Sequence, residues 1–276
     1  MRLSLSTGCL AHLPLRQTFQ LAARAGFEGV ELVMAPEIWI RGARYVAGLT
    51  QAYSLPVLSV HQALMGISPA GRGPQRIVDA VEMALRLDAP CVVMHGTWAT
   101  RWGSARAQRW LRALDGAQRR LSGSGTHLSI ENQGIYSLAD GHSLLAPLPL
   151  LVSFADRHGL SITLDTCHLG TAGIGLLDAY ASVGARLCNL HLSDLGDAKL
   201  LLNARPLRTL LVHHQMPGEG GLPLATLLAR VAEDGYTGPV ILEISPVSLR
   251  AWSTRRIGER LEQAARFVRQ AATGSP

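Results

Sequence analysis

The chain has 276 residues, of which 47% are hydrophobic, and it carries a formal net charge of +6 with a pI near 9.6. This length suits one α/β barrel of about 250 residues, and no apolar run approaches the roughly 18 residues that a membrane helix needs. The positive charge does not by itself indicate a nucleic-acid partner, because Lys199 is the only lysine and such an arginine skew is typical of genomic base composition.

Short apolar runs alternate with longer amphipathic segments along the whole chain. The predicted strands cover residues 3–7, 29–33, 57–62, 91–96, 127–132, 161–166, 187–194 and 240–245, and helix-like segments between them include 15–25, 75–87, 105–121, 150–158, 222–234 and 253–272. Eight strand-then-helix units predict a closed parallel (β/α)8 barrel, or TIM barrel, that covers 1–276 as a single domain. An open doubly wound sheet is disfavoured because no GxGxxG follows the first strand.

Most of the predicted strands end in a histidine or an acidic residue. In a barrel of this kind functional groups gather at the carboxyl ends of the strands, and an unpaired buried carboxylate costs several kcal/mol. A divalent cation would compensate the negative charge of such a group of side chains. A purely structural polar cluster is the alternative, but it would bury three carboxylates together without a cation. We therefore expect one divalent ion or more, Mn²⁺ or Zn²⁺, bound by Glu131, Asp165, His191 and Glu243.

Other residues near these strand ends have two interpretations. His61 and His95 either bind metal or substrate or form hydrogen bonds inside the barrel. Glu31 either contacts substrate, supports the site from behind or forms a salt bridge to a helix. Trp98 either walls a polar pocket or packs in the core. The four cysteines include no CxxC pair, which favours reduced thiols in a cytoplasmic protein.

Several motifs resemble those of the xylose-isomerase-like barrel superfamily, and the similarity spans about residues 3–268. They are GFEGVEL (26–32), IEN (130–132), DTCHLGTAG (165–173), HLSD (191–194), GEG (218–220) and LEIS (242–245). The superfamily includes sugar isomerases and epimerases as well as the endonuclease IV type of abasic-site nuclease. The resemblance implies that Glu131, Asp165, His191 and Glu243 bind the metal common to both branches. In the isomerase branch it further implies that His168 contacts substrate and that the two glutamates flank the reacting carbon.

The nuclease branch binds three zinc ions, and its first site also uses histidines at the positions of His61 and His95. Its third site combines the equivalent of His168 with an Asp-x-His just before GEG. Here that tripeptide is Val212-His213-His214, so a complete third site would need His213 or Asp194 to replace the missing aspartate. The nuclease also has a tyrosine that inserts into the DNA, and the residue at the corresponding position here is Leu64. These departures favour the isomerase branch.

We therefore expect a metal-dependent isomerase or epimerase that acts on a small sugar or related hydroxycarbonyl. Glu131 and Glu243 would exchange a proton through an enediolate while His168 holds a substrate oxygen. The alternatives are an endonuclease IV-like zinc-dependent phosphodiesterase, an inosose-type dehydratase and a non-catalytic binder. His214 could add to a further metal or substrate site. The partner would be a carbohydrate-like small molecule rather than a membrane or nucleic acid, and a homo-oligomer is possible. The apolar segment 195–217 would act as a lid or as a surface where another chain docks.

Overall fold

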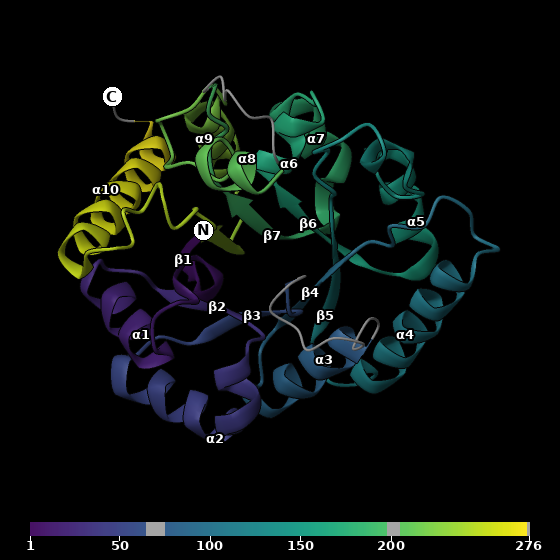
Figure 1. The fold of residues 1–276 in the computed structure, drawn as a ribbon, viewed down its shortest axis with the longest axis horizontal. Helices are drawn as coiled ribbons and strands as arrows, with labels where there is room; N and C mark the ends of the chain where they lie inside the picture. The colour runs from purple at the N-terminus through teal and green to yellow at the C-terminus, as the bar shows by residue number, and fades with distance from the viewer. Residues whose placement is uncertain (65–74, 198–204, 275–276) are drawn as a thin grey trace.

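The computed structural model describes residues 1–64, 75–197 and 205–274. Within these ranges the chain forms a closed barrel of eight parallel strands in chain order, and β1 pairs with β8 to close it. The helices form an outer ring around the strands (Figure 1). The predicted (β/α)8 barrel is therefore confirmed. None of the helices in the described ranges is both long enough and apolar enough to cross a membrane.

The strands are β1 (Arg2–Ser6), β2 (Gly29–Val33), β3 (Val57–His61), β4 (Cys91–His95), β5 (His127–Glu131), β6 (Ser161–Asp165), β7 (Leu187–Leu192) and β8 (Pro239–Leu242). The α-helices are α1 (Leu15–Arg24), α2 (Pro36–Tyr53), α3 (Gln75–Leu87), α4 (Ala105–Leu121), α5 (Leu148–His158), α6 (Thr166–Thr171), α7 (Leu176–Val183), α8 (Arg205–Leu211), α9 (Leu224–Glu233) and α10 (Thr254–Thr273). Three short 3-10 helices complete the described elements: η1 (Thr7–Leu10), η2 (Asp140–His142) and η3 (Gly184–Arg186).

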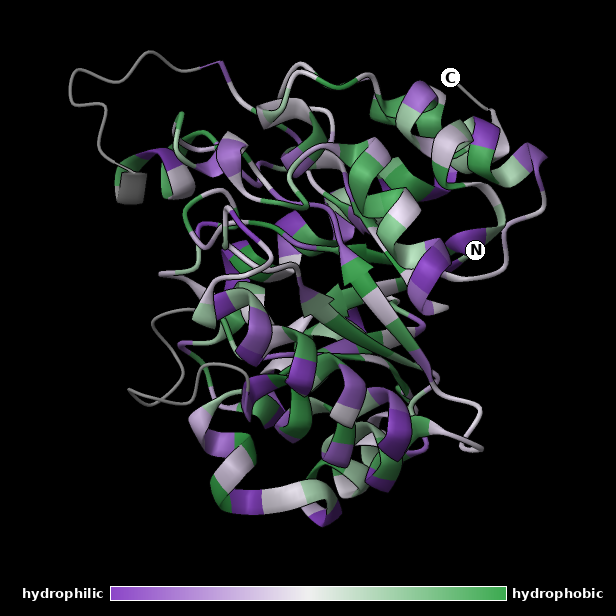
Figure 2. Cartoon of the chain, turned by 90° about the vertical axis from the view of Figure 1, so that its right-hand side faces the viewer, coloured by the Kyte–Doolittle hydropathy of each residue, from purple (hydrophilic) through white to green (hydrophobic). Residues whose placement is uncertain are grey.

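The hydrophobic core fills the layer between the strands and the surrounding helices. Helix α1 is representative, since Leu15, Phe19 and Ala22 recur at helical spacing and are all buried. On β2, Val30 and Leu32 are fully buried in the same core. In Figure 2 the strands are mostly green, whereas green and purple alternate along the helices, as expected when each helix buries one face. This packing supports the strands whose ends carry the polar groups.

The inside of the barrel is polar, in contrast with the aliphatic layers usual in this fold. Ser129 and Thr163 lie 2.7 Å apart through their hydroxyl oxygens, and Ser59 donates a hydrogen bond of 2.8 Å to Glu31. All four side chains are fully buried. Because buried polar groups need partners, the interior forms a hydrogen-bonded layer beneath the strand ends.

Candidate metal centre and cavity

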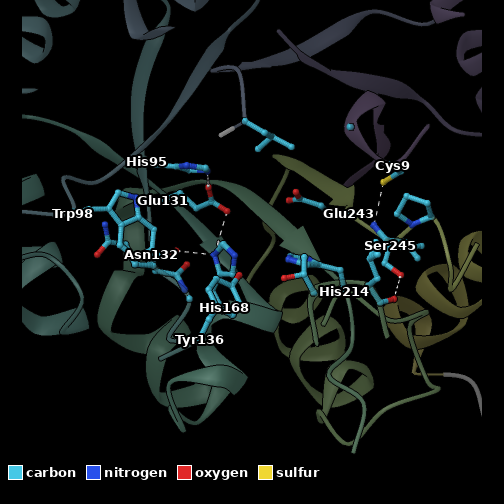
Figure 3. Close-up of a pocket in the computed structure, with 18 residues that line it drawn as sticks. Cys9, His95, Trp98, Glu131, Asn132, Tyr136, His168, His214, Glu243 and Ser245 are labelled. Atoms are coloured by element: carbon cyan, nitrogen blue, oxygen red, sulfur yellow. Dashed lines mark hydrogen bonds and ion pairs between the residues drawn. The ribbon is translucent and has the colours of Figure 1, made fainter. Parts of the chain in front are cut away.

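A cavity of about 320 Å³ opens at the carboxyl ends of the strands. Glu131 and Glu243 reach into it from two sides, with His168 and His214 on its lower wall in the view of Figure 3. His95 and Trp98 line another part of the wall. The remaining lining is largely apolar and includes Leu64, Leu210, Ile244 and Pro246. A small molecule in this cavity would therefore meet carboxylates and imidazoles on one side and an apolar wall on the other.

The structure brings Glu131, Asp165, His191 and Glu243 together, with one ligand atom from each within 4.8 Å of the others. Nδ1 of His191 lies 2.9 Å from Oε2 of Glu243, 3.2 Å from Oε1 of Glu131 and 3.9 Å from Oδ2 of Asp165. Two atoms that bind opposite sides of one ion would lie about 4.4 Å apart, since each bond is about 2.2 Å long. Small shifts of these side chains would therefore let them bind a single cation.

Two observations indicate that this donor set fits a divalent cation. Oδ2 of Asp165 is buried and has no hydrogen-bond partner among the residues that the structure describes. Burial also raises the pKa of Asp165, and the nearby positive charges of His168 and His214 do not fully offset it. A cation would supply the charge that this carboxylate needs.

Without a metal, His191 carries the compensating charge of the cluster. Burial opposes its protonation, but Glu31, Glu131 and Glu243 outweigh this effect and raise the pKa of His191 well above its ordinary value. In turn, hydrogen bonding to His191 overcomes the opposing effect of burial and lowers the pKa of Glu243 to about 2. The pKa of Glu131 is also held well below its usual range, with His191, His61 and His95 outweighing burial. Both glutamates are therefore ionised at neutral pH.

Asp165 is oriented by its neighbours on two sides. Asn132 accepts a hydrogen bond of 2.6 Å from the Asp165 N–H and donates one of 3.2 Å to the Asp165 carbonyl. Oδ1 of Asp165 caps α6 by accepting the N–H of His168 at 2.7 Å. These contacts leave Oδ2 directed at the cluster. Asn132 lies in the IEN motif, but nothing in the sequence alone revealed this pairing.

Glu31 lies behind His191 rather than in the cavity. Its Oε2 is 3.0 Å from Nε2 of His191 and accepts hydrogen bonds from Ser59 at 2.8 Å and Asn189 at 3.2 Å. Glu31 is fully buried and does not line the cavity. Of the three interpretations of Glu31, this geometry fits support of the site and not a substrate contact, because the ring of His191 lies between the carboxylate and the other ligands. The position of Glu31 instead fixes which nitrogen of His191 faces Glu131 and Glu243.

His61 and His95 form a second group with Glu131. Oε2 of Glu131 lies 3.4 Å from Nε2 of His61 and 3.0 Å from Nε2 of His95, while its Oε1 faces His191. Nδ1 of His61 lies 2.6 Å from the Gln62 carbonyl, which keeps Nε2 facing Glu131. Burial opposes protonation of His61, yet Glu131 and Glu31 raise its pKa to about 9. The carboxylate of Glu131 thus bridges two ligand groups.

Asp165, His168 and His214 form a third group. His214 has a left-handed backbone conformation, with φ of 50°, and its Nδ1 lies 3.0 Å from Oγ of Ser193. His213 is not part of the group, although it lies next in the chain. Asp194 is not part of it either.

Asp194 instead accepts the backbone N–H groups of Leu195, Gly218 and Leu222, which holds the loop around the GEG motif. Neither His213 nor Asp194 therefore meets the condition for a complete third site of the nuclease type.

His168 is held at the cavity wall by close packing. Its Nδ1 lies 2.9 Å from the Asn132 carbonyl, and its ring meets Tyr136 edge-on at 6.0 Å. Gly134 permits this arrangement, because a Cβ there would lie 2.6 Å from the Tyr136 hydroxyl and 2.8 Å from Cδ2 of His168. Tyr136, Gln133 and Gly134 line the cavity and were not predicted from the sequence.

Of the segment 195–217, residues 198–204 lie outside the described residues. In the remainder, α8 places Thr209 and Leu210 against the cavity, and the backbone of Asp194 pairs with that of Gln215. The arginines of α4 lie far from these groups on the outer ring and are exposed, namely Arg106, Arg109, Arg112, Arg119 and Arg120. They do not contribute to the cavity.

Comparisons with known proteins extend over nearly the whole chain. An uncharacterised protein of Mycobacterium tuberculosis is 28% identical over 98% of this chain and 97% of its own. Fructoselysine 3-epimerase of Shigella flexneri is 21% identical over 84% of this chain and 86% of that enzyme.

Solved structures have the same fold. A xylose isomerase domain protein of Salmonella typhimurium superposes with a TM-score of 0.75 at 15% identity, covering 98% of this chain and 97% of that one. D-allulose 3-epimerase from Methylomonas, in complex with D-allulose, gives a TM-score of 0.72 at 16% identity with the same coverage. Residues 19–271 match the family model described as xylose isomerase-like TIM barrel. The chain therefore belongs to the xylose isomerase-like TIM barrel family.

Proposed function

We propose that this protein is a metal-dependent isomerase or epimerase of a small sugar or related hydroxycarbonyl. The observation that carries the proposal is the placement of Glu131 and Glu243. Their carboxylates approach the same nitrogen of His191, at 3.2 and 2.9 Å, from β5 and from the residue after β8. Both line the cavity, so a substrate carbon between them would have a carboxylate on each face.

Glu131, Asp165, His191 and Glu243 would hold the ion. A divalent cation supplies Lewis-acid polarisation of a carbonyl, which acidifies the neighbouring C–H. One glutamate then takes the proton from one face of the carbon, and the other returns a proton to the opposite face through an enediolate. His168 donates through Nδ1 to the Asn132 carbonyl, which leaves Nε2 to bond a substrate oxygen. Leu64, Leu210 and Ile244 would form an apolar wall beside the bound substrate.

The relatives support this chemistry. Fructoselysine 3-epimerase matches most of this chain, and the solved structures with the same fold include D-allulose 3-epimerase. Both enzymes are named 3-epimerases, one of fructoselysine and the other of D-allulose. A ketose or ketose-like compound is accordingly the first substrate class to examine.

The direct test is exchange of a carbon-bound proton with solvent deuterium, followed by NMR over a panel of ketoses, aldoses and inososes. We expect exchange in the metal-loaded protein and its loss in Glu131→Gln and in Glu243→Gln. Glu259→Gln is a matched control, because this glutamate is on the outer surface of α10 and pairs only with Arg255 and Arg256 among the described residues. Loss of water from an inosose without exchange into the remaining substrate would indicate a dehydratase.

A second candidate function is hydrolysis of a phosphodiester at an abasic site in DNA. The specific observation in its favour is that the central ligand group shares Glu131 with the His61–His95 group and Asp165 with the His168–His214 group, so that there are donors for more than one ion. Metal analysis with stoichiometric assays on abasic DNA in added Zn²⁺ separates the two candidates. Strand cleavage that disappears in Glu131→Gln, with no proton exchange on the sugar panel, would replace the first proposal with the second.

A further inference from the structure

Two cysteine thiols meet at the end of the barrel opposite the cavity. Sγ of Cys91 and Sγ of Cys188 lie 3.4 Å apart, although the residues are separated by 97 positions in the chain. Cys91 begins β4 and Cys188 is the second residue of β7, and β5 and β6 lie between these strands in the barrel order. The contact therefore crosses the interior of the barrel rather than joining neighbouring strands.

The other two cysteines have no such partner thiol among the described residues. Cys9 donates to the Leu242 carbonyl, and Cys167 accepts the backbone N–H of His214. Both are buried, as is Cys91, whereas Cys188 is partly exposed. A small oxidant in solution would therefore reach Cys188 first.

The surroundings of Cys188 favour its reaction. The hydrogen bond with Cys91 lowers the pKa of Cys188, and the Ser129 and Ser161 hydroxyls add to this against the opposing effect of burial. A thiolate is the nucleophile in thiol oxidation. The pair thus combines the thiol of a partly exposed residue, Cys188, with a buried second sulfur already in contact with it.

We propose that Cys91 and Cys188 are a modification site, oxidised by hydrogen peroxide or a small organic hydroperoxide to a disulfide across the barrel. The Cys188 thiolate attacks the terminal oxygen of the hydroperoxide: an S–O bond forms, the O–O bond breaks, Cys188 becomes a sulfenic acid, and hydroxide or alkoxide leaves. The Cys91 thiol then attacks the sulfenic sulfur, the S–S bond forms, and water leaves. Together the two thiols lose two electrons and the peroxide gains them. A disulfide is about 2.05 Å long, so the sulfurs need to approach each other by about 1.4 Å.

The disulfide would join the two strands whose other ends carry His95 and His191. Cross-linking residues this far apart in sequence restricts the unfolded chain strongly. The oxidised protein is therefore expected to unfold at a higher temperature than the reduced protein. The cavity lies at the opposite ends of the same strands, so the ligand groups should keep their geometry.

The test treats the full-length protein with hydrogen peroxide and measures the intact mass, the peptide map and the melting temperature. We expect loss of two hydrogen atoms, a peptide containing Cys91 bonded to Cys188, a higher melting temperature, and reversal of all three by dithiothreitol. Cys91→Ser should stop at the sulfenic acid, so that dimedone labels Cys188. Cys188→Ser should give no cross-link, while Cys9→Ser, the control, should cross-link as the wild type does.

Three results would overturn the proposal. One is four free thiols after peroxide treatment of the wild type, counted after unfolding. Another is a cross-link or dimedone adduct that maps to Cys9 or Cys167. The third is an unchanged loss of two hydrogen atoms in Cys188→Ser. The peptide map of the wild type decides the matter even when a variant fails to fold.

Discussion

Glu31 holds the imidazole of His191 from the side opposite the proposed metal ligands. Its carboxylate is itself fixed by Ser59 and Asn189, so the ring has one orientation and presents Nδ1 to Glu131 and Glu243. A carboxylate behind a histidine ligand sets its tautomer and raises its basicity, and loss of such a partner typically lowers metal affinity by about 10- to 100-fold. A residue that touches neither metal nor substrate can thus control the affinity of the site.

Replacement Glu31→Gln should therefore weaken Mn²⁺ or Zn²⁺ binding by about 10- to 100-fold. Gln keeps the shape of the side chain but loses the charge that His191 contacts. Isothermal titration calorimetry of the metal alone measures the effect, and Glu259→Gln on the outer surface of α10 serves as control. An affinity within experimental error of the wild type would show that Glu31 does not act through His191.

Burial raises the pKa of Asp165, a candidate metal ligand. Its ionised carboxylate therefore destabilises the fold when no cation is present. We expect Asp165→Asn to lower metal affinity and, in metal-free protein, to raise the melting temperature, since Asn removes the buried charge and caps α6 as well as Asp does. Thermal unfolding with and without chelator measures both effects. A variant that melts lower than the wild type in chelator would contradict this interpretation of the site.

At the scale of elements, the end of β8 explains why Glu243 lies where it does. The strand ends at Leu242, three residues before the predicted end at 245. Sγ of Cys9 donates to the Leu242 carbonyl at 3.4 Å and accepts the Ile244 N–H at 3.0 Å. This thiol of η1 thus replaces strand pairing for the backbone groups on both sides of Glu243. The thiol thereby holds the backbone that aims this carboxylate into the cavity.

We expect Cys9→Ala to lower the free energy of unfolding by about 1–2 kcal/mol, because two buried backbone groups lose their partner. Cys9→Ser should keep most of this stability, since a hydroxyl both donates and accepts. Urea unfolding of the two variants measures the difference. Equal stabilities for Ala and Ser would mean that packing rather than hydrogen bonding determines the role of Cys9.

Strand positions could be predicted from the sequence because each strand is a short apolar run bounded by turns, and β2 was predicted with the bounds observed. The ends of the other strands were predicted less accurately, since strand ends depend on contacts such as that of Cys9 with β8. The helices α3 and α4 were also predicted with their observed bounds, because their apolar spacing continues for several turns.

For the molecule as a whole, the closed barrel explains which parts of the site the sequence could reveal. Strand ends of a parallel barrel converge, so Glu131, Asp165, His191 and Glu243 could be grouped before the structure was known. Contacts across the barrel could not be predicted from the sequence, because they depend on strand register and on which strands face each other. The Glu31–His191 and Cys91–Cys188 contacts are of this kind, and no local pattern reports them.

Metal binding should stabilise the whole fold, and the stabilisation should grow with pH. A ligand at about 100 times its Kd adds about 2.7 kcal/mol, which corresponds to a rise of roughly 5 °C in Tm for a chain of this size. In metal-free protein the carboxylates raise the pKa of His191, so its proton stabilises the fold at low pH and this contribution is lost as pH rises through that pKa. The cation must displace the same proton, and apparent affinity should therefore increase up to that pKa.

The measurements are Tm with excess Mn²⁺ or with chelator between pH 6 and 9, and calorimetry in buffers of different ionisation enthalpy. We expect a metal-dependent Tm difference that widens with pH, together with proton release on binding. Asp165→Asn, which keeps His191 and the helix cap, should show a smaller difference at every pH. A difference that is constant with pH, without proton release, would mean that His191 is already neutral in the metal-free protein and that the carboxylates do not hold its proton.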